Sequence, residues 1–143
     1  MGRRIVLDTN VIVAGLRSRR GAAFRLLSLL GSGGFTHCLS VPLLFEYEDV
    51  LTRPGMVPLS AEAIEDILDG LCATAEQRPL YFLWRPQLVD AADDLILEIA
   101  VTGQCDTIIT YNQRHFGGSE RFGVRVQTPA DFLRALHEKG EDV

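Results

Sequence analysis

The sequence predicts an α/β fold: a three-layer α/β/α sandwich with a mostly parallel five-stranded sheet. Short β-branched and apolar runs alternate along the chain with longer segments in which apolar residues recur at helical spacing. This alternation is typical of βαβ units, whose parallel sheets are covered by helices on both faces. The 143 residues, of which 47% are hydrophobic and 23% charged, have the size and balance of one globular domain with its core over about residues 4–136.

In the first half of the chain, the expected elements begin or end at residues that favour such boundaries. Ser40 and Ser60 are good N-caps for the helices that follow them. Gly31 ends the helix expected over 22–30. The basic stretch from Arg17 to Gly21 interrupts the helical spacing and is expected to be an exposed loop. The expected elements are a strand over 4–7, helices from 11 and over 22–30, a strand over 36–41, and helices over 41–51 and 61–74.

The second half repeats the alternation. Asp90 is expected to cap a helix that Gly103 ends, and Pro129 begins the last helix. Further strands are expected over 80–83, 106–110 and 124–126, and the last helix over 129–136.

Charge, hydropathy and cysteine content narrow the function classes. A net charge of −5 argues against a broadly basic nucleic-acid clamp, so any polyanion must bind a local patch. The apolar runs are shorter than the ~20 residues that span a bilayer, and no apolar leader follows Met1, so we expect a cytoplasmic protein with no membrane partner. The cysteines form no C-x-x-C pair and are expected to be buried free thiols; they are Cys38, Cys72 and Cys105.

Polar side chains gather where the first and fourth expected strands end. Ligands of open α/β sheets bind beyond the carboxyl ends of the strands, so these positions are the first candidates for a site. A carboxylate after a buried strand needs a hydrogen-bond donor, a cation or a proton. Capping of the following helix by Asp8 or Asn10 is the alternative interpretation. The residues concerned are Asp8, Thr9, Asn10, Thr110 and Asn112.

The helix after the second strand carries three acidic residues, two of which flank its apolar face. At 100° per residue, Glu46 lies roughly 40° from Val50, and Glu48 lies at a similar angle from Leu44. Asp49 points away from that face. A solvated position is the alternative interpretation for either glutamate.

A third acidic group, Asp90, Asp93 and Asp94, opens the helix before the fourth strand. Negative charge there favours the positive end of the helix dipole, so capping is the alternative interpretation. Asp93 lies roughly 20° from Ala100 at the edge of the apolar stripe, whereas Asp94 faces the opposite side. Asp93 is therefore expected to point inward.

Asp8, Glu46 and Asp93 come from three elements that a parallel sheet would bring to one edge. Carboxylates repel one another unless a divalent cation neutralises them, and oxygen ligands favour Mg²⁺ or Mn²⁺ over zinc. Such a site can orient and deprotonate a water molecule and stabilise the charge of a phosphodiester displacement, with one or two metal ions.

Four blocks in this order resemble the PIN-domain nucleases, and most closely the branch of toxin components of toxin-antitoxin systems. Together they span the chain from residue 4 to about 133. They are Ile5-Val-Leu-Asp-Thr-Asn-Val11, the helix from Ser40 to Leu51, Asp90-Ala-Ala-Asp93-Asp94 leading to Ala100, and Cys105-Asp-Thr-Ile-Ile-Thr-Tyr-Asn112 followed by His115-Phe116.

The resemblance implies an α/β/α sandwich, Mg²⁺- or Mn²⁺-dependent cleavage of RNA, and frequent homodimers. It matches Asp8, Glu46 and Asp93 to the acidic metal ligands. Many PIN nucleases have a fourth aspartate where this chain has Asn112, whose amide oxygen can still take a metal-bound water but should bind a second ion more weakly. The positions that support the site are Thr9, Asn10, Asp94 and Thr110.

The partners implied by the resemblance are RNA and a small antitoxin protein that occludes the site. Guanidinium groups suit phosphate geometry, although solubilising charge is the alternative interpretation of these loop residues. Trp84 and the helix from Ala61 to Thr74 could line a substrate groove or a dimer surface. The candidate phosphate contacts are Arg17, Arg19, Arg20 and Arg114.

Other functions fit the sequence less well. A phosphatase of the haloacid-dehalogenase type would need a second acid where Asn10 stands, and a nucleotide-binding Rossmann protein would need a glycine-rich loop after the first strand. A non-catalytic PIN fold that binds RNA or protein is the main alternative, because of Asn112 and the acidic net charge. His37, His115 and His137 are too scattered to act together, and His115 could at most approach the site from the loop beyond Asn112.

Overall fold

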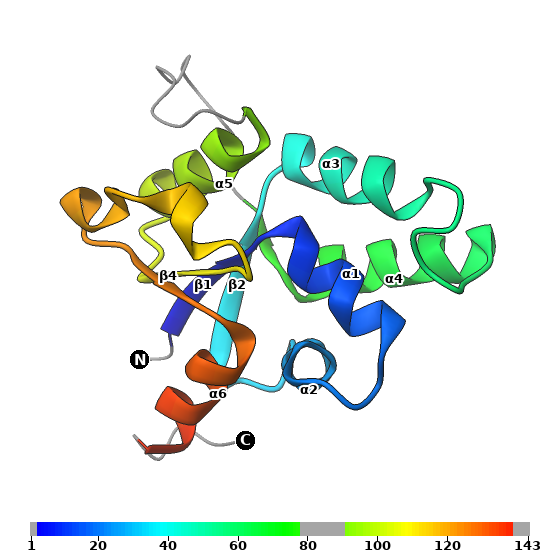
Figure 1. Cartoon of the computed structure of the whole chain (residues 1–143), viewed down its shortest axis with the longest axis horizontal. Helices are drawn as coiled ribbons and strands as arrows, with labels where there is room; N and C mark the ends of the chain where they lie inside the picture. Colours follow the sequence, from blue (N-terminus) through cyan, green and yellow to red (C-terminus); the bar gives the residue numbers. More distant parts are fainter. Residues whose placement is uncertain (1–2, 78–90, 139–143) are drawn as a thin grey trace.

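The computed structural model describes residues 3–77 and 91–138 and contains one five-stranded sheet of order β3-β2-β1-β4-β5 (Figure 1). All four neighbouring pairs of strands are parallel. The strands are β1 (Arg3–Leu7), β2 (Phe35–Leu39), β3 (Glu76–Gln77), β4 (Thr107–Ile109) and β5 (Arg125–Gln127).

The central strand β1 organises the core and the site. Its residues Ile5, Val6 and Leu7 are fully buried, and Ile5 is in register with His37 of β2 and Thr107 of β4. Because parallel strands end at one edge, the residues that follow β1 and β4 lie next to each other: the backbone N–H of Asp8 donates to the Ile109 carbonyl at 2.9 Å.

Helices cover both faces of the sheet, as the alternation of β1 side chains shows. Arg3 lies over the ring of Phe132 in α6, whereas Arg4 donates to the Gly103 carbonyl just beyond α5, so α6 and α5 lie on opposite faces. Figure 1 shows the start of α1 and the first turns of α3 and α5 near the same end of the sheet. The helices are α1 (Thr9–Arg17), α2 (Ala22–Ser28), α3 (Val41–Leu51), α4 (Ala61–Thr74), α5 (Ala91–Thr102), η1 (Gln113–Phe116), η2 (Ser119–Phe122) and α6 (Pro129–Glu138).

The α/β fold and the parallel five-stranded sheet are confirmed, with element bounds within a few residues of those expected. Ser40 and Ser60 cap α3 and α4 through their side chains, and the loop from Arg17 to Gly21 is exposed. The strand expected over 80–83 lies outside the described residues, as do Trp84 and the Asp90 cap. The strand that pairs with β2 is Glu76–Gln77.

The expected burial of the cysteines is confirmed for two of the three. Cys38 and Cys105 are buried thiols, but Cys72 on the outer helix α4 is only half-buried. No helix within residues 3–77 and 91–138 combines the length and apolar character that a membrane span requires.

Candidate active site

The Thr110 hydroxyl is the centre of a buried polar network at the carboxyl edge of the sheet. It donates to Asp8 Oδ2 at 2.7 Å and accepts from Asn10 Nδ2 at 3.3 Å and from the Asn112 backbone N–H at 2.9 Å. Thr110 follows β4 and Asp8 follows β1, so the pairing of these two strands places them together. The network thus joins four residues that the sequence proposed for the site.

Asp8 has a structural role as well as a place in this network. It is the N-cap of α1, and its Oδ1 accepts from the Thr9 N–H at 2.8 Å. The side chain is only 8% exposed. The capping interpretation of Asp8 is therefore confirmed, and its second oxygen also takes part in the polar network around Thr110.

Helix α3 reaches the same edge through Tyr47, which is fully buried and donates its hydroxyl hydrogen bond to the Leu7 carbonyl. Burial, followed by the negative charge of Asp8, raises the pKa of Tyr47 well above its usual value. Among the α3 acids, Glu46 is half-buried, whereas Glu48 and Asp49 are exposed. The helical period therefore predicted correctly that Glu46 lies nearer the buried face than Asp49. Glu48, expected to flank that face as well, is exposed.

Helix α5 brings further buried acids to the site. Asp93 and Asp94 are 8% and 9% exposed, and Glu98, one turn after Asp94, is equally buried. Asp94, expected on the side of the helix opposite Asp93, is buried as well, because α5 contacts α3, η1 and three strands and more than one side of the helix is covered. Burial, with a contribution from the charge of Asp94, raises the pKa of Glu98.

His115 contacts the candidate site more directly than its position in the sequence indicated. Its Nδ1 lies 3.1 Å from Asp93 Oδ2, while half of its side chain stays exposed at the surface. The available signal was its position in η1, three residues after Asn112, since a short helix there turns back toward α5. The contact connects the start of α5 to the chain segment that follows Thr110 and Asn112.

The donor chemistry of this edge suits Mg²⁺ or Mn²⁺. Buried carboxylates after β1 and on α5 concentrate negative charge; burial raises the pKa of Glu98, and the charge of Asp94 adds to that rise. Within residues 3–77 and 91–138, however, no three His, Cys, Asp or Glu side chains stand close enough to form a metal site. The ligand set of Asp8, Glu46 and Asp93 therefore stays a prediction, supported by the type and burial of its donors.

A groove of about 570 Å³ begins at this site and runs between α1 and α3, which lie side by side in Figure 1. Arg17 stands at its far end, where Nε donates to the Met56 carbonyl at 2.7 Å and holds the side chain against the wall. The groove is lined by Thr9, Asn10, Val13, Ala14, Arg17, Val50 and Met56.

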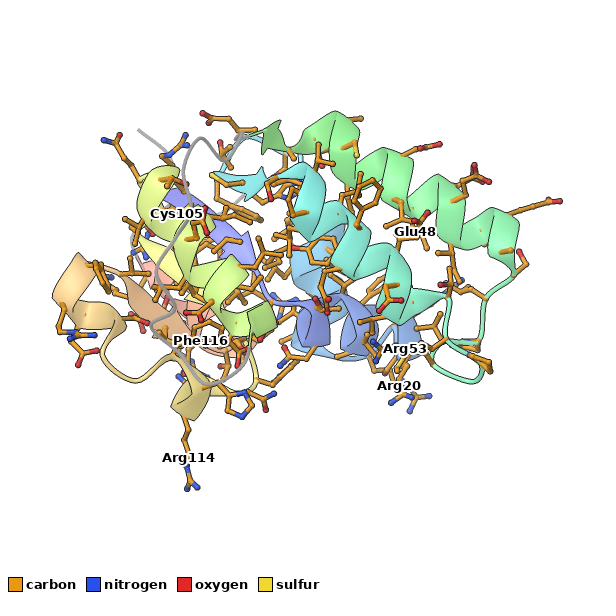
Figure 2. All side chains as sticks on the ribbon, turned by 90° about the horizontal axis from the view of Figure 1, so that it is seen from above. Arg20, Glu48, Arg53, Cys105, Arg114 and Phe116 are labelled. Atoms are coloured by element: carbon orange, nitrogen blue, oxygen red, sulfur yellow. The ribbon has the colours of Figure 1, made fainter. Side chains whose placement is uncertain are left out.

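The four candidate phosphate contacts form two groups. Arg17, Arg19 and Arg20 are exposed in and beside the loop after α1, at the far end of the groove. Figure 2 shows Arg20 at the same end of the molecule as Arg53, whereas Arg114 projects from η1, well apart from both. The sheet edge with the buried acids therefore has basic groups on two sides.

Comparison with known proteins places the fold. The family model described as PIN domain matches residues 4–114. A structure of VapBC2 from Rickettsia felis bound to a DNA fragment from their promoter is similar at 18% identity and TM-score 0.58, covering 87% of this chain and 98% of that chain. FitAcB from Neisseria gonorrhoeae is similar at 19% identity and TM-score 0.51, covering 88% and 98%. None of the curated proteins compared with the sequence matches it.

Proposed function

The chain belongs to the PIN domain family, whose members are in general nucleases, and we propose that it is a metal-dependent endoribonuclease that hydrolyses RNA phosphodiester bonds. One observation carries the proposal: the Thr110 hydroxyl holds Asp8 at the carboxyl edge of the sheet, where α5 adds the buried carboxylates Asp93 and Asp94. A buried surplus of acids at a sheet edge is costly for folding and useful for holding a cation.

We assign the ion to Asp8 and Asp93, with Glu46 as the third ligand. When bound, Mg²⁺ or Mn²⁺ would neutralise these carboxylates, lower the pKa of a water molecule and stabilise charge on the phosphate. Thr110 and Thr9 orient Asp8 through its two oxygens, and His115 orients Asp93. Asn112, whose backbone N–H is held by Thr110, would present its amide to the substrate or to water.

The groove between α1 and α3 would take the substrate strand. It starts at Thr9 and Asn10, beside Asp8, and its volume is within the range of about 300–1,000 Å³ that ligand sites have. Its walls include apolar side chains that suit bases, and the arginines at its far end suit phosphates. Arg114 would contact the strand on the other side of the site.

We further propose that the enzyme is the toxin of a toxin-antitoxin pair and acts as a homodimer. The likeness to the VapBC2 and FitAcB structures is in line with this assignment, and a small antitoxin would inhibit it by covering the acidic edge. For the dimer, Val41 and Phe45 lie one turn apart on α3 and are both exposed, as apolar residues of an interface are in a free subunit.

The function is tested by incubating the purified protein with mixed single-stranded RNA in Mn²⁺ or Mg²⁺, and again after adding a chelator. We expect cleavage that the chelator stops and that Asp93→Asn abolishes. The same variant should bind Mn²⁺ more weakly in calorimetry. Cleavage that persists in the chelator would contradict the metal dependence.

A non-catalytic binding module is the second candidate. Asn112 favours it, because this residue removes one negative charge from the position of the fourth acid. A folded wild-type protein that binds RNA but cleaves none in Mn²⁺ would support this candidate over the nuclease.

A further inference from the structure

Tyr111 is an exposed aromatic side chain set between two residues of the candidate active site. It follows Thr110 and precedes Asn112, and it is 45% exposed. A single exposed aromatic side chain is ordinary on a protein surface, so it is the position of Tyr111 beside the Thr110 network that makes it a candidate contact for a ligand. Neither the match to the family model nor the polar network around Thr110 gives the ring a role.

The backbone of Tyr111 is anchored at the site. Its N–H donates to Asn10 Oδ1 at 3.3 Å. Partial burial raises the pKa of its phenol, and the backbone of Ala23 in α2 opposes that rise. A partly buried ring on a fixed backbone loses little conformational freedom when a planar group packs on it.

The surroundings of Tyr111 fit a single nucleic-acid strand. Asn10 accepts from the Tyr111 N–H and also lines the groove between α1 and α3, so the backbone of Tyr111 lies at the end of the groove. Arg114, three residues along the chain, is exposed and can face a phosphate. Exposed aromatic rings and basic side chains in the same region of a protein commonly hold unpaired bases and their backbone.

We propose that Tyr111 is a base-stacking subsite that receives one unpaired RNA base beside the phosphodiester held at the acidic edge. The inference rests on the proposed function for its substrate. It makes single-stranded RNA the substrate class, because a base within a duplex is stacked on its neighbours and presents no free face to the ring.

The test measures binding of a fluorescein-labelled single-stranded RNA of mixed sequence by anisotropy, in chelator so that no metal-dependent cleavage occurs. We expect Tyr111→Ala to raise Kd about tenfold, a typical loss for one stacked base. Tyr111→Phe and Tyr111→Trp keep an aromatic face and should stay within about twofold of wild type. Phe122→Ala is the matched control, since Phe122 is 39% exposed on η2 and pairs with Arg121 away from the site.

A second readout identifies the stacked base. In a series of RNAs, one base at a time is replaced by an abasic residue; wild type should lose affinity most at one position, and Tyr111→Ala should be insensitive there. Equal Kd values for wild type and Tyr111→Ala would overturn the proposal and leave the ring as a protein contact. Cleavage in Mn²⁺ is scored separately, so a protein that stacks the base but cleaves nothing would refute the nuclease and keep the subsite.

Discussion

Two clusters of charged side chains lie at different places on the same sheet, and they differ in how their charge is balanced. Near the start of β1, Arg4 is paired with Glu76 and donates from Nε and Nη2 to the Gly103 carbonyl at 3.1 and 2.8 Å. At the end of β1, Asp8 accepts from neutral donors on Thr9 and Thr110, and α5 adds two further buried carboxylates.

The difference separates a structural cluster from a candidate site. The Arg4 cluster joins β1 to β3 through one pair of opposite charge and to the end of α5 through hydrogen bonds to a carbonyl, so it stabilises the fold without needing a ligand. The acidic edge concentrates charge of one sign, and a bound cation or a shifted pKa can relieve that cost. The Arg4 pair is only half-buried, whereas the acidic edge is buried, and the sign of the charges distinguishes the two further.

The largest expected effect comes from exchanging one aspartate in each region. Asp8→Asn keeps an N-cap for α1 but removes a charge, so we expect RNA cleavage to fall by about a thousandfold with little change in stability. The matched control is Asp106→Asn, because Asp106 accepts from the Arg4 N–H at 2.9 Å and from the Thr107 hydroxyl at 2.7 Å. It should lose about 1–2 kcal/mol of stability and keep full activity. Cleavage and urea unfolding are measured for both; the comparison fails if Asp106→Asn is the inactive variant.

His37 offers a contrast to the acidic edge, because it is a buried titratable group that stays neutral instead of charged. Burial lowers the pKa of His37 to about 4, and its Nε2 is 2.9 Å from the Thr74 hydroxyl. The unfolded chain has a histidine pKa of about 6.5, so this contribution to stability is complete above pH 6.5 and is lost as pH falls toward 4. The loss should reach about 3 kcal/mol. Chemical unfolding at several pH values measures it, and His37→Leu should flatten the dependence; an unchanged slope would contradict the assignment.

Removing the cation of the Arg4 cluster should destabilise the fold. Arg4→Leu leaves Glu76 and the Gly103 carbonyl without these partners, which we expect to cost about 2 kcal/mol in urea unfolding. Activity per folded molecule should stay at the wild-type level. Arg25→Leu on the exposed side of α2 serves as the control and should change stability by less than about 0.5 kcal/mol. An Arg4 variant as stable as wild type would show that the cluster is not structural.

The smallest effect is expected at the basic loop beyond the groove. Arg20→Ala should weaken RNA binding a few-fold and reduce the slope of log Kd against log salt by about one, because one phosphate contact is lost. Arg121→Ala, whose guanidinium lies over Phe122, is the control with no expected change in slope. Equal salt dependence of wild type and Arg20→Ala would remove this loop from the RNA path.

Local patterns in the sequence were sufficient for the strands, the helices and part of the site. Hydrophobic period and capping residues placed α3 and α4 almost to the residue, because these signals depend on neighbours in the chain. The rule that parallel strands end at one edge was enough to bring Asp8, Asn10, Thr110 and Asn112 together.

Only the tertiary structure decided which further residues join that edge. A helical period indicates one buried stripe but not how many elements pack around a helix. The burial of Asp94 and Glu98 on α5 could therefore not be predicted from it. The contact of His115 with Asp93 depends on how η1 turns back, and the contact of Tyr111 with Asn10 depends on the pairing of β1 with β4. Such contacts join residues far apart in the chain, and their free energy arises only when the core has packed.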